Sequence, residues 1–401
     1  MLPKTTKALV VAEAQDKSEL PYAARVIEQE LRPLKGNELL VRIEAVAFNH
    51  RDVCYILCFH WQLADLTSIQ LWIRKNLYPG IGVGEVLGSD GAGMELLPIS
   101  LFERNSPWWG IGSVIASGTA NDILIGRRVF LTPSRGWDQD PTGPEQKFTV
   151  IGGVKGPSIG TFAEYVIVER NEVIEIPPHL DFEHAAAWPL AGVTAWRAIN
   201  YQAGVKRGHN VLVTGIGGGV AIIALQLLVF IGANVYVTSG SDKKIQRAVE
   251  LGAKAGFNYK SGMDLEKVLK QENHTLDSVI DSAGGDILRL TSKILKPGGV
   301  LDFIASNRFY DERGFSQYTP QGYMAYSFSL LICCAHHHLG SAMGSKRELL
   351  EATNFIAEHR IIPVVCNVIE GLESFEDGFE LMKEGAQFGK IVIRVHRNSK
   401  L

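Results

Sequence analysis

The sequence has few cysteines, and they lack the spacing of a disulfide framework. Their number is odd, which fits a reducing compartment better than an oxidising one. The five are Cys54, Cys58, Cys333, Cys334 and Cys366. The N-terminal stretch MLPKTTKALVV also lacks a cleavage signal and the arginine and serine content of a transit peptide. Together these absences predict a cytoplasmic protein.

The sequence also lacks an excess of charge and a membrane span. A net charge of −3 over 401 residues gives no electrostatic reason to expect nucleic acid or an anionic membrane as a partner. The run Val220–Val237 is uncharged and long enough to suggest a span, but Gly232 divides it into a helical and an extended part. We therefore expect a globular protein that acts on a small-molecule substrate, with a homodimer left open as its assembly.

Two patterns of hydrophobic residues divide the chain, whose length allows two domains. Up to about Ile176, short stretches bounded by turn residues predict β-strands. These stretches are KALVVAE, ELLVRIEAVAFN, RRVFL and FAEYVIVE. From Asp181, stretches with helical and with strand period alternate along the chain. Such alternation predicts a parallel sheet covered by helices on both faces, and hence an α/β protein.

A glycine-rich turn follows the predicted strand Val211–Thr214 and leads directly into a predicted helix. Glycines at such a junction allow a tight turn and a close approach of the backbone to a pyrophosphate, while the helix N-terminus provides N–H donors. Val220 stands where the motif has its third glycine, so the letters match less well than the context does. The predicted dinucleotide site comprises Gly215, Gly217, Gly218, Gly219 and Val220.

The end of the next predicted strand, Asn234–Ser239, favours NADPH over NADH. NAD-binding domains usually have an acid at this point, which holds the 2′-hydroxyl of the ribose. Hydroxyl and ammonium groups suit a 2′-phosphate better, although Asp242 is a competing signal for an unphosphorylated ribose. The groups that this chain offers are Ser239, Gly240, Ser241 and Lys244.

Several motifs stand in the order that they have in the medium-chain dehydrogenases/reductases. They are NHRD at Asn49–Asp52, LGSDGAG at Leu87–Gly93, GTFAEYV at Gly160–Val166, LAGVTAW at Leu190–Trp196, TGIGGG at Thr214–Gly219, DSAGG at Asp281–Gly285, GSAMGSK at Gly340–Lys346 and FGKIVI at Phe388–Ile393. The chain therefore resembles this superfamily and, within it, the zinc-independent quinone oxidoreductases.

The resemblance implies a GroES-like, β-rich catalytic domain and an inserted Rossmann domain with a doubly wound parallel sheet. We expect the GroES-like domain at 1–180 and the Rossmann domain at 181–338. The C-terminal segment, 339–401, is expected to complete the edge of the Rossmann sheet and to return to the first domain.

Two positions separate this chain from the zinc-dependent members that it resembles. Those enzymes have a cysteine where this chain has Asn49, and a His-Glu pair where it has Ser89 and Asp90. The lobe with four closely spaced structural cysteines is missing as well. Because catalytic zinc needs three protein ligands of thiolate or imidazole character, the resemblance predicts an enzyme without a metal.

The resemblance also implies which residues hold the cofactor. In the bacterial quinone oxidoreductases, three positions bind the 2′-phosphate, and they correspond here to Gly240, Lys244 and Tyr259. Thr194 is expected near the cofactor, and Lys390 near its phosphates. NADPH is therefore favoured by a second argument, separate from the glycine turn.

Without zinc, hydrogen bonds must polarise the substrate, and the protein must position the cofactor and exclude water. The candidate polar groups near the nicotinamide are Asn49, Asp52 and Tyr78. Tyr78 is the best titratable group among them, although it precedes Pro79 and packing explains it equally well. We expect hydride transfer from NADPH to a quinone, an enone or a related carbonyl compound. The alternative is a non-catalytic protein that binds NADPH as a structural ligand or redox sensor.

Three stretches depart from the family pattern and show no helical or strand period. They span residues 54–71, 94–113 and 307–338. We interpret them as translated intron or misjoined exon, and the alternative is genuine lineage-specific loops. The first and third contain clusters of cysteine and histidine, but neither cluster has the paired spacing of a zinc module.

Overall fold

The computed structural model describes residues 2–14, 22–49, 81–94, 114–119, 122–156, 158–261, 269, 275–284, 290–291, 293–304 and 337–396. Asp52, Tyr78, the stretch 54–71 and most of 94–113 and 307–338 lie outside them. The described residues divide into two compact units. The first unit comprises those up to Leu190 and from Ser345 onwards, and the second unit comprises those from Ala191 to Gly344. The sequence places these boundaries at 180/181 and 338/339.

The first unit is built on an eight-stranded sheet. Its order is β10-β6-β4-β3-β18-β17, with β5 and β9 also paired to β3. Among these strands only β17 and β18 run parallel. The bounds are β3 Glu38–Ala47, β4 Asp90–Met94, β5 Val114–Ser117, β6 Val129–Leu131, β9 Tyr165–Glu169, β10 Val173–Glu175, β17 Val365–Glu370 and β18 Lys390–Arg394.

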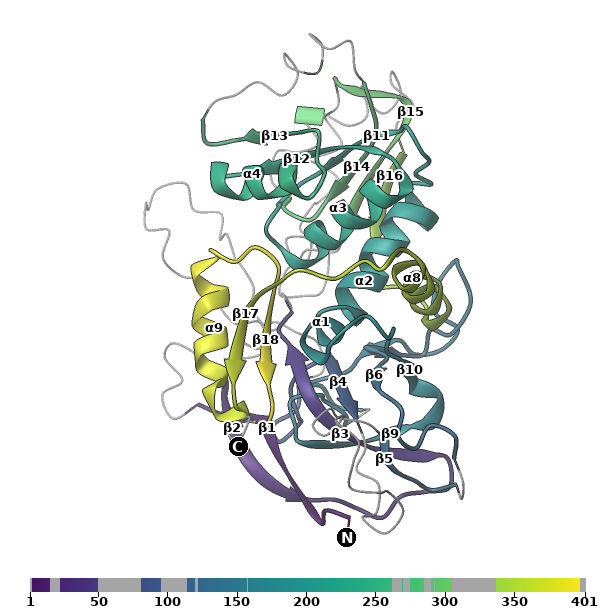
Figure 1. The fold of residues 1–401 in the computed structure, drawn as a ribbon, viewed down its shortest axis with the longest axis vertical. Coiled ribbons are helices and arrows are strands. Elements are labelled where there is room, and N and C mark those ends of the chain that lie inside the picture. Colours follow the sequence, from purple (N-terminus) through teal and green to yellow (C-terminus); the bar gives the residue numbers. More distant parts are fainter. Residues whose placement is uncertain are drawn as a thin grey trace. The chain divides into compact units, whose positions relative to one another are not determined.

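Two strand pairs and several helical elements complete the first unit (Figure 1). Strands β1 (Thr5–Glu13) and β2 (Tyr22–Glu30) form an antiparallel pair, and so do β7 (Ser134–Arg135) and β8 (Thr149–Val150). The helical elements are η1 Arg170–Glu172, α1 Phe182–Ala186, α8 Lys346–His359, η4 Leu372–Ser374 and α9 Phe375–Glu384. The core joins β1, β3, β9 and β18 through fully buried side chains such as Leu9, Val41, Val168 and Ile391. The four strands predicted in this part are confirmed as β1, β3, β6 and β9.

Strands β4 and β5 lie end to end along β3. The last residue of β4, Met94, is opposite Arg42, and the first residue of β5, Val114, is opposite Val41. The next pairs are Leu40 with Ala116 and Leu39 with Ser117, so the register shifts by one residue between Leu40 and Val41. Two strand halves separated in sequence thus cover one continuous stretch of β3.

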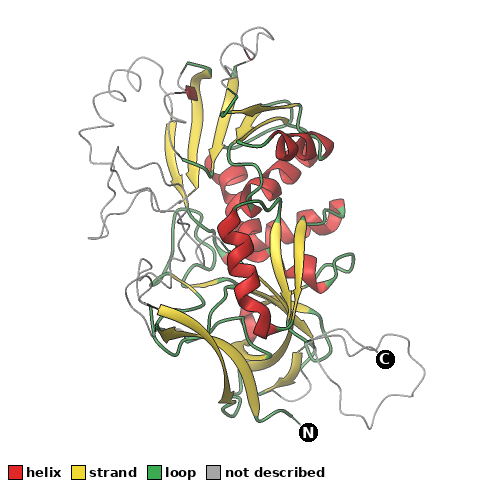
Figure 2. Ribbon diagram, turned by 90° about the vertical axis from the view of Figure 1, so that its left-hand side faces the viewer, coloured by secondary structure: helices red, strands yellow, loops and turns green. Residues whose placement is uncertain are grey.

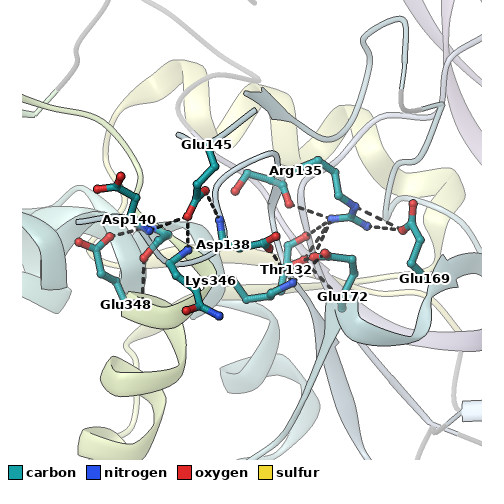
Figure 3. Close-up of polar contacts among 12 residues, drawn as sticks. Thr132, Arg135, Asp138, Asp140, Glu145, Glu169, Glu172, Lys346 and Glu348 are labelled. Atoms are coloured by element: carbon teal, nitrogen blue, oxygen red, sulfur yellow. Dashed lines mark hydrogen bonds and ion pairs between the residues drawn. The ribbon is translucent and has the colours of Figure 1, made fainter. Parts of the chain in front are cut away.

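A polar network joins the loop after β6 to the start of α8 (Figure 3). The Glu145 carboxylate accepts hydrogen bonds from three successive backbone N–H groups, those of residues 138–140, at 2.6–2.8 Å. These bonds hold the pKa of Glu145 down at about 2. The Lys346 ammonium lies 2.8 Å from Asp138 and 3.0 Å from Glu172. Ser345 and Glu348 form a capping box, which explains why α8 begins at Lys346.

The second unit contains a six-stranded parallel sheet, as predicted (Figure 2). Its order, β13-β12-β11-β14-β15-β16, is that of dinucleotide-binding domains, with the direction of winding reversing between β11 and β14. The bounds are β11 Asn210–Val213, β12 Asn234–Ser239, β13 Ala255–Asn258, β14 Leu276–Asp281, β15 Leu295–Ile304 and β16 His337–Ser341. The α/β class and the Rossmann domain are therefore confirmed.

Helices α3 (Gly219–Ile231) and α4 (Asp242–Glu250) pack on β11, β12 and β13. Helix α3 ends where Gly232 adopts the left-handed conformation, and β12 begins two residues later, as the sequence predicts. Pro189 begins α2 (Pro189–Trp196), which continues into the π-helix η2 (Arg197–Gln202). No helix among the described residues is both long and apolar enough to cross a membrane.

The start of strand β16 was not predicted from the sequence. His337 and His338, the last residues of the third anomalous stretch, belong to β16 and pair with Val300 and Leu301 of β15. A run of three histidines has no strand signature, so the hydrophobic pattern could not show where this edge strand begins.

Candidate functional site

The glycine-rich turn has the backbone conformation that its sequence predicts. Gly215 and Gly217 have φ angles of +68° and +130°, which residues other than glycine rarely adopt. A Cβ on Gly215 would also lie 3.1 Å from Ser282 Oγ and from Ala283 Cβ. The turn therefore requires glycine at this position both for its conformation and for space.

The turn delivers the chain to the N-terminus of α3. The N-cap residue is Gly218, which has no side chain that could cap this end. The first turn contains no acidic residue, so nothing anionic within it offsets the positive end of the helix dipole. This arrangement, at the point where the strand order reverses, fits the pyrophosphate of a dinucleotide.

Asp281 fixes the loop on the other side of the turn. The Thr214 hydroxyl donates to its Oδ1, and the Gly284 N–H lies 3.0 Å from both carboxylate oxygens. The Ser282 hydroxyl donates to the Thr214 carbonyl at 2.9 Å. The motif DSAGG includes this loop. The hydrogen bond from Thr214, directly after β11, to Asp281, the last residue of β14, orders the loop and is visible only in the structure.

Some of the groups expected at the adenosine ribose lie close together at the end of β12. Ser239 is buried, and a Cβ on Gly240 would lie 2.8 Å from the Tyr259 hydroxyl and 2.8 Å from Lys260 Cε. Lys260 is a further cation at this point, which neither the strand-end pattern nor the family positions include. Asp242, the competing signal, accepts a hydrogen bond from Asn258 at 2.8 Å. Lys244 lies half-buried on α4.

A buried acid lies elsewhere in the second unit. Asp302 on β15 is fully buried, and neither of its carboxylate oxygens has a hydrogen-bond partner among the described residues. Burial raises its pKa to about 7; the Arg197 guanidinium opposes the rise and Asp281 adds to it. Strands of parallel sheets are usually apolar at such positions, and the sequence pattern gave no reason to single out this residue.

The first unit holds a network of buried polar groups at the adjoining ends of β3, β4 and β18. Asn49 Nδ2 donates to Asp90 Oδ2 at 2.9 Å and to Ser89 Oγ at 3.2 Å. The Lys390 ammonium donates to Asn49 Oδ1 at 2.6 Å and to Asp90 Oδ2 at 3.1 Å. Asp90 Oδ1 accepts the N–H of Leu190, in the first turn of α2, at 2.9 Å. Asn49, Asp90 and Lys390 are at most 5% exposed.

The structure sorts the predicted site residues into these places. The glycine turn, Ser239, Gly240, Ser241, Lys244 and Tyr259 belong to the second unit, and so does Thr194, whose hydroxyl lies 3.9 Å from Met343 Sδ. Met343 has a φ of +56°, an uncommon conformation that the sequence did not indicate. Asn49 and Lys390 belong to the first unit. Lys390, expected near the phosphates, has its ammonium on Asn49 and Asp90, and its contact with phosphate stays a prediction.

Comparisons with known proteins agree on the family. Residues 219–358 match the family model described as "Zinc-binding dehydrogenase". The zinc-type alcohol dehydrogenase-like protein YogA of Leptosphaeria maculans is 38% identical over 91% of this chain and 92% of its own length. A zinc-type alcohol dehydrogenase-like protein of Schizosaccharomyces pombe is 29% identical over 92% of this chain and 93% of its own.

Solved structures agree as well. The crystal structure of an NAD-dependent alcohol dehydrogenase has a TM-score of 0.74 to this chain at 27% identity, over 97% of this chain and 99% of that one. Together with the glycine turn and the strand order of the second unit, these likenesses assign the chain. It belongs to the zinc-type alcohol dehydrogenase-like family of the medium-chain dehydrogenase/reductase superfamily, a family of oxidoreductases.

Proposed function

We propose that the protein is a zinc-independent oxidoreductase that reduces a quinone, an enone or a related carbonyl compound with NADPH. When bound, NADPH supplies the hydride. Gly215, Gly217 and the N-terminus of α3 would hold its pyrophosphate. Gly240, Lys244 and Tyr259 would hold the 2′-phosphate together with Lys260, because two ammonium groups and a hydroxyl offer donors that suit a doubly charged phosphate.

The observation that carries the proposal is the position of the Lys390 ammonium. Zinc in this family would need ligands from Asn49, Ser89 and Asp90, of which only Asp90 is a common zinc ligand. Asn49 Oδ1 and Asp90 Oδ2 already accept hydrogen bonds from Lys390. A divalent cation held by the same oxygens would be repelled by an ammonium a few ångströms away. The residues present therefore do not fit zinc, and the buried ammonium of Lys390 lies among them instead.

The test is NADPH oxidation by the full chain against a panel of quinones, enones and ketones, with and without a strong chelator. We expect turnover with at least one class, no loss of activity with chelator, and no stoichiometric zinc by elemental analysis. One zinc ion per chain, lost together with the activity, would contradict the metal-free assignment. Tight NADPH binding without turnover of any compound would favour the non-catalytic alternative.

A further inference from the structure

Among the described residues, Lys390 is the one lysine with a buried side chain, and its surroundings are unusual. Its side chain is 5% exposed, and that of its partner Asp90 is fully buried. Burying an ion pair removes two charges from water, and well-packed apolar residues are often at least as stabilising. Stability alone therefore gives a weak reason for this pair in the core, which directs attention to what the ammonium can do.

The geometry holds the ammonium in one orientation and leaves it one donor. An ammonium has three N–H groups. Two of them are directed at Asn49 Oδ1 and Asp90 Oδ2, and no described residue accepts the third. Asp90 is itself fixed by the N–H of Leu190 and the amide of Asn49, so the ammonium cannot follow a mobile partner. A positive charge held by a rigid shell, with one donor that no described residue uses, is the arrangement that stabilises negative charge on a neighbouring atom.

We propose that Lys390 is a catalytic residue that polarises the carbonyl oxygen of the substrate, the task that zinc performs in metal-dependent dehydrogenases. The proposal rests on the proposed function and deepens it. Hydride addition places negative charge on that oxygen, and the third N–H of Lys390 donates to it. For a ketone, Nζ also passes a proton to the oxygen and regains one from water, so that the C=O double bond is replaced by one C–H and one O–H bond. A quinone that takes up the same hydride and proton becomes a hydroquinone, in which both C=O groups have become C–O–H groups. In each case NADPH is oxidised to NADP⁺. Asn49 and Asp90 are positioning residues that act through Lys390.

A phenol that ionises on binding tests this charge without any turnover. The 4-nitrophenolate anion has a phenolate oxygen on a planar ring, as the anion of a hydroquinone does, and it is detected by its absorbance. In the wild-type chain we expect the anion to bind about tenfold or more tightly than the neutral phenol, because a cation within a few ångströms lowers a pKa by roughly one or more units.

The variants must remove the charge without leaving an unpaired carboxylate. Lys390→Met alone leaves Asp90 buried and unpaired and is expected to unfold more easily, so Lys390→Met/Asp90→Asn is the informative chain. It should fold, as judged by its melting temperature, and bind anion and phenol about equally. Lys390→Arg retains a cation and should retain the preference. Lys346→Met, which removes a half-buried, carboxylate-paired lysine of the same unit outside this network, should leave the preference unchanged.

Kinetics and cofactor binding separate the alternatives. If Lys390 polarises the substrate, the double variant loses kcat at least about a hundredfold, as removal of one oxyanion donor does elsewhere, while its Kd for NADPH is unchanged. A weaker Kd for NADPH with an unchanged kcat would show a phosphate ligand instead and overturn the inference. The inference would also be overturned if the wild-type chain showed no preference for the 4-nitrophenolate anion over the neutral phenol, or did not bind the anion at all. A wild-type chain that prefers the anion but reduces no carbonyl compound would leave Lys390 as an oxyanion site and refute the proposed function alone.

Discussion

Asp302 gives the sharpest prediction about stability, because a buried carboxyl that has no hydrogen-bond partner among the described residues should make the second unit less stable as the pH rises. Its folded pKa of about 7 stands above the ordinary value of 3.8. Below about pH 4 the group is protonated in both states and carries no penalty. Above pH 7 the folded state must hold the charge. The folded and ordinary pKa values differ by about three units, which corresponds to at most about 4 kcal/mol of lost stability.

Asp302→Asn removes the charge and keeps nearly the same shape. From the two pKa values, the variant should exceed wild type by about 1.5 kcal/mol at pH 5 and about 4 kcal/mol at pH 8. The assay is urea unfolding followed by intrinsic fluorescence at several pH values, read on the transition of the second unit if the two units unfold separately. Glu250→Gln, at an exposed acid of α4 in the same unit, is the matched control for the change from carboxyl to amide.

Two results would refute the reasoning. A difference between Asp302→Asn and wild type that stays constant with pH would show that the carboxyl titrates near its ordinary value. A variant less stable than wild type at pH 8 would show that the charged form is stabilised, most directly by the Arg197 guanidinium, whose attraction lowers the pKa of Asp302. Either outcome would mean that burial does not dominate at this position.

Three further predictions concern other parts of the chain. Gly215→Ala should weaken NADPH binding and lower the melting temperature, both measured by fluorescence. Alanine is strained at a φ of +68°, and its Cβ would crowd Ser282 and Ala283. Unchanged binding would argue against the turn as the pyrophosphate site. Lys244→Ala and Lys260→Ala should each weaken NADPH binding by about 1.5–3 kcal/mol and NADH binding little, so equal losses for both cofactors in titrations would contradict the 2′-phosphate assignment. Burial, aided by Arg42, lowers the pKa of His396 to about 4, so stability should fall by up to about 3 kcal/mol as the pH drops from 6.5 to 4. His396→Phe should lack that dependence in thermal unfolding, and a variant that keeps it would show that another group is responsible.

The elements that the sequence predicts are those whose signal is local. The glycine turn at Gly215 and the break at Gly232 each depend on residues a few positions apart, and the structure has both. The network at Lys390 depends on residues 341 positions apart, Asn49 and Lys390, which meet because β18 pairs with β3. No periodicity or local spacing in the sequence predicts the contact between Asn49 and Lys390. A lysine next to a glycine resembles a phosphate ligand in sequence, and only its surroundings show a buried ion pair.

The same distinction applies to the anomalous stretch 94–113, whose structure lies outside the described residues except for the backbone of Met94. Its flanks are informative. Gly93 lies opposite Ile43, while Ala116 and Ser117 lie opposite Leu40 and Leu39. If residues 94–113 are removed, Val114 follows Gly93 directly and takes the place opposite Arg42, and Ile115 comes opposite Val41. The register shift between Leu40 and Val41 then disappears, and β4 and β5 become one strand, in which only the shift between Ile43 and Ala45 remains.

We therefore predict that the chain without residues 94–113 folds and is more stable than the full chain. Replacing a 20-residue connection by a peptide bond removes a loop-closure entropy of about 2–3 kcal/mol, provided that the segment makes no compensating contacts. Urea unfolding of the first unit measures the difference, and hydrogen exchange should show continuous protection from Gly91 to Ser117. Removal of residues 122–141, an equally long segment that contains β6 and β7, is the control and should abolish folding. If the chain without 94–113 fails to fold while the full chain is stable, the segment is genuine structure, and its interpretation as intron or misjoined exon is wrong.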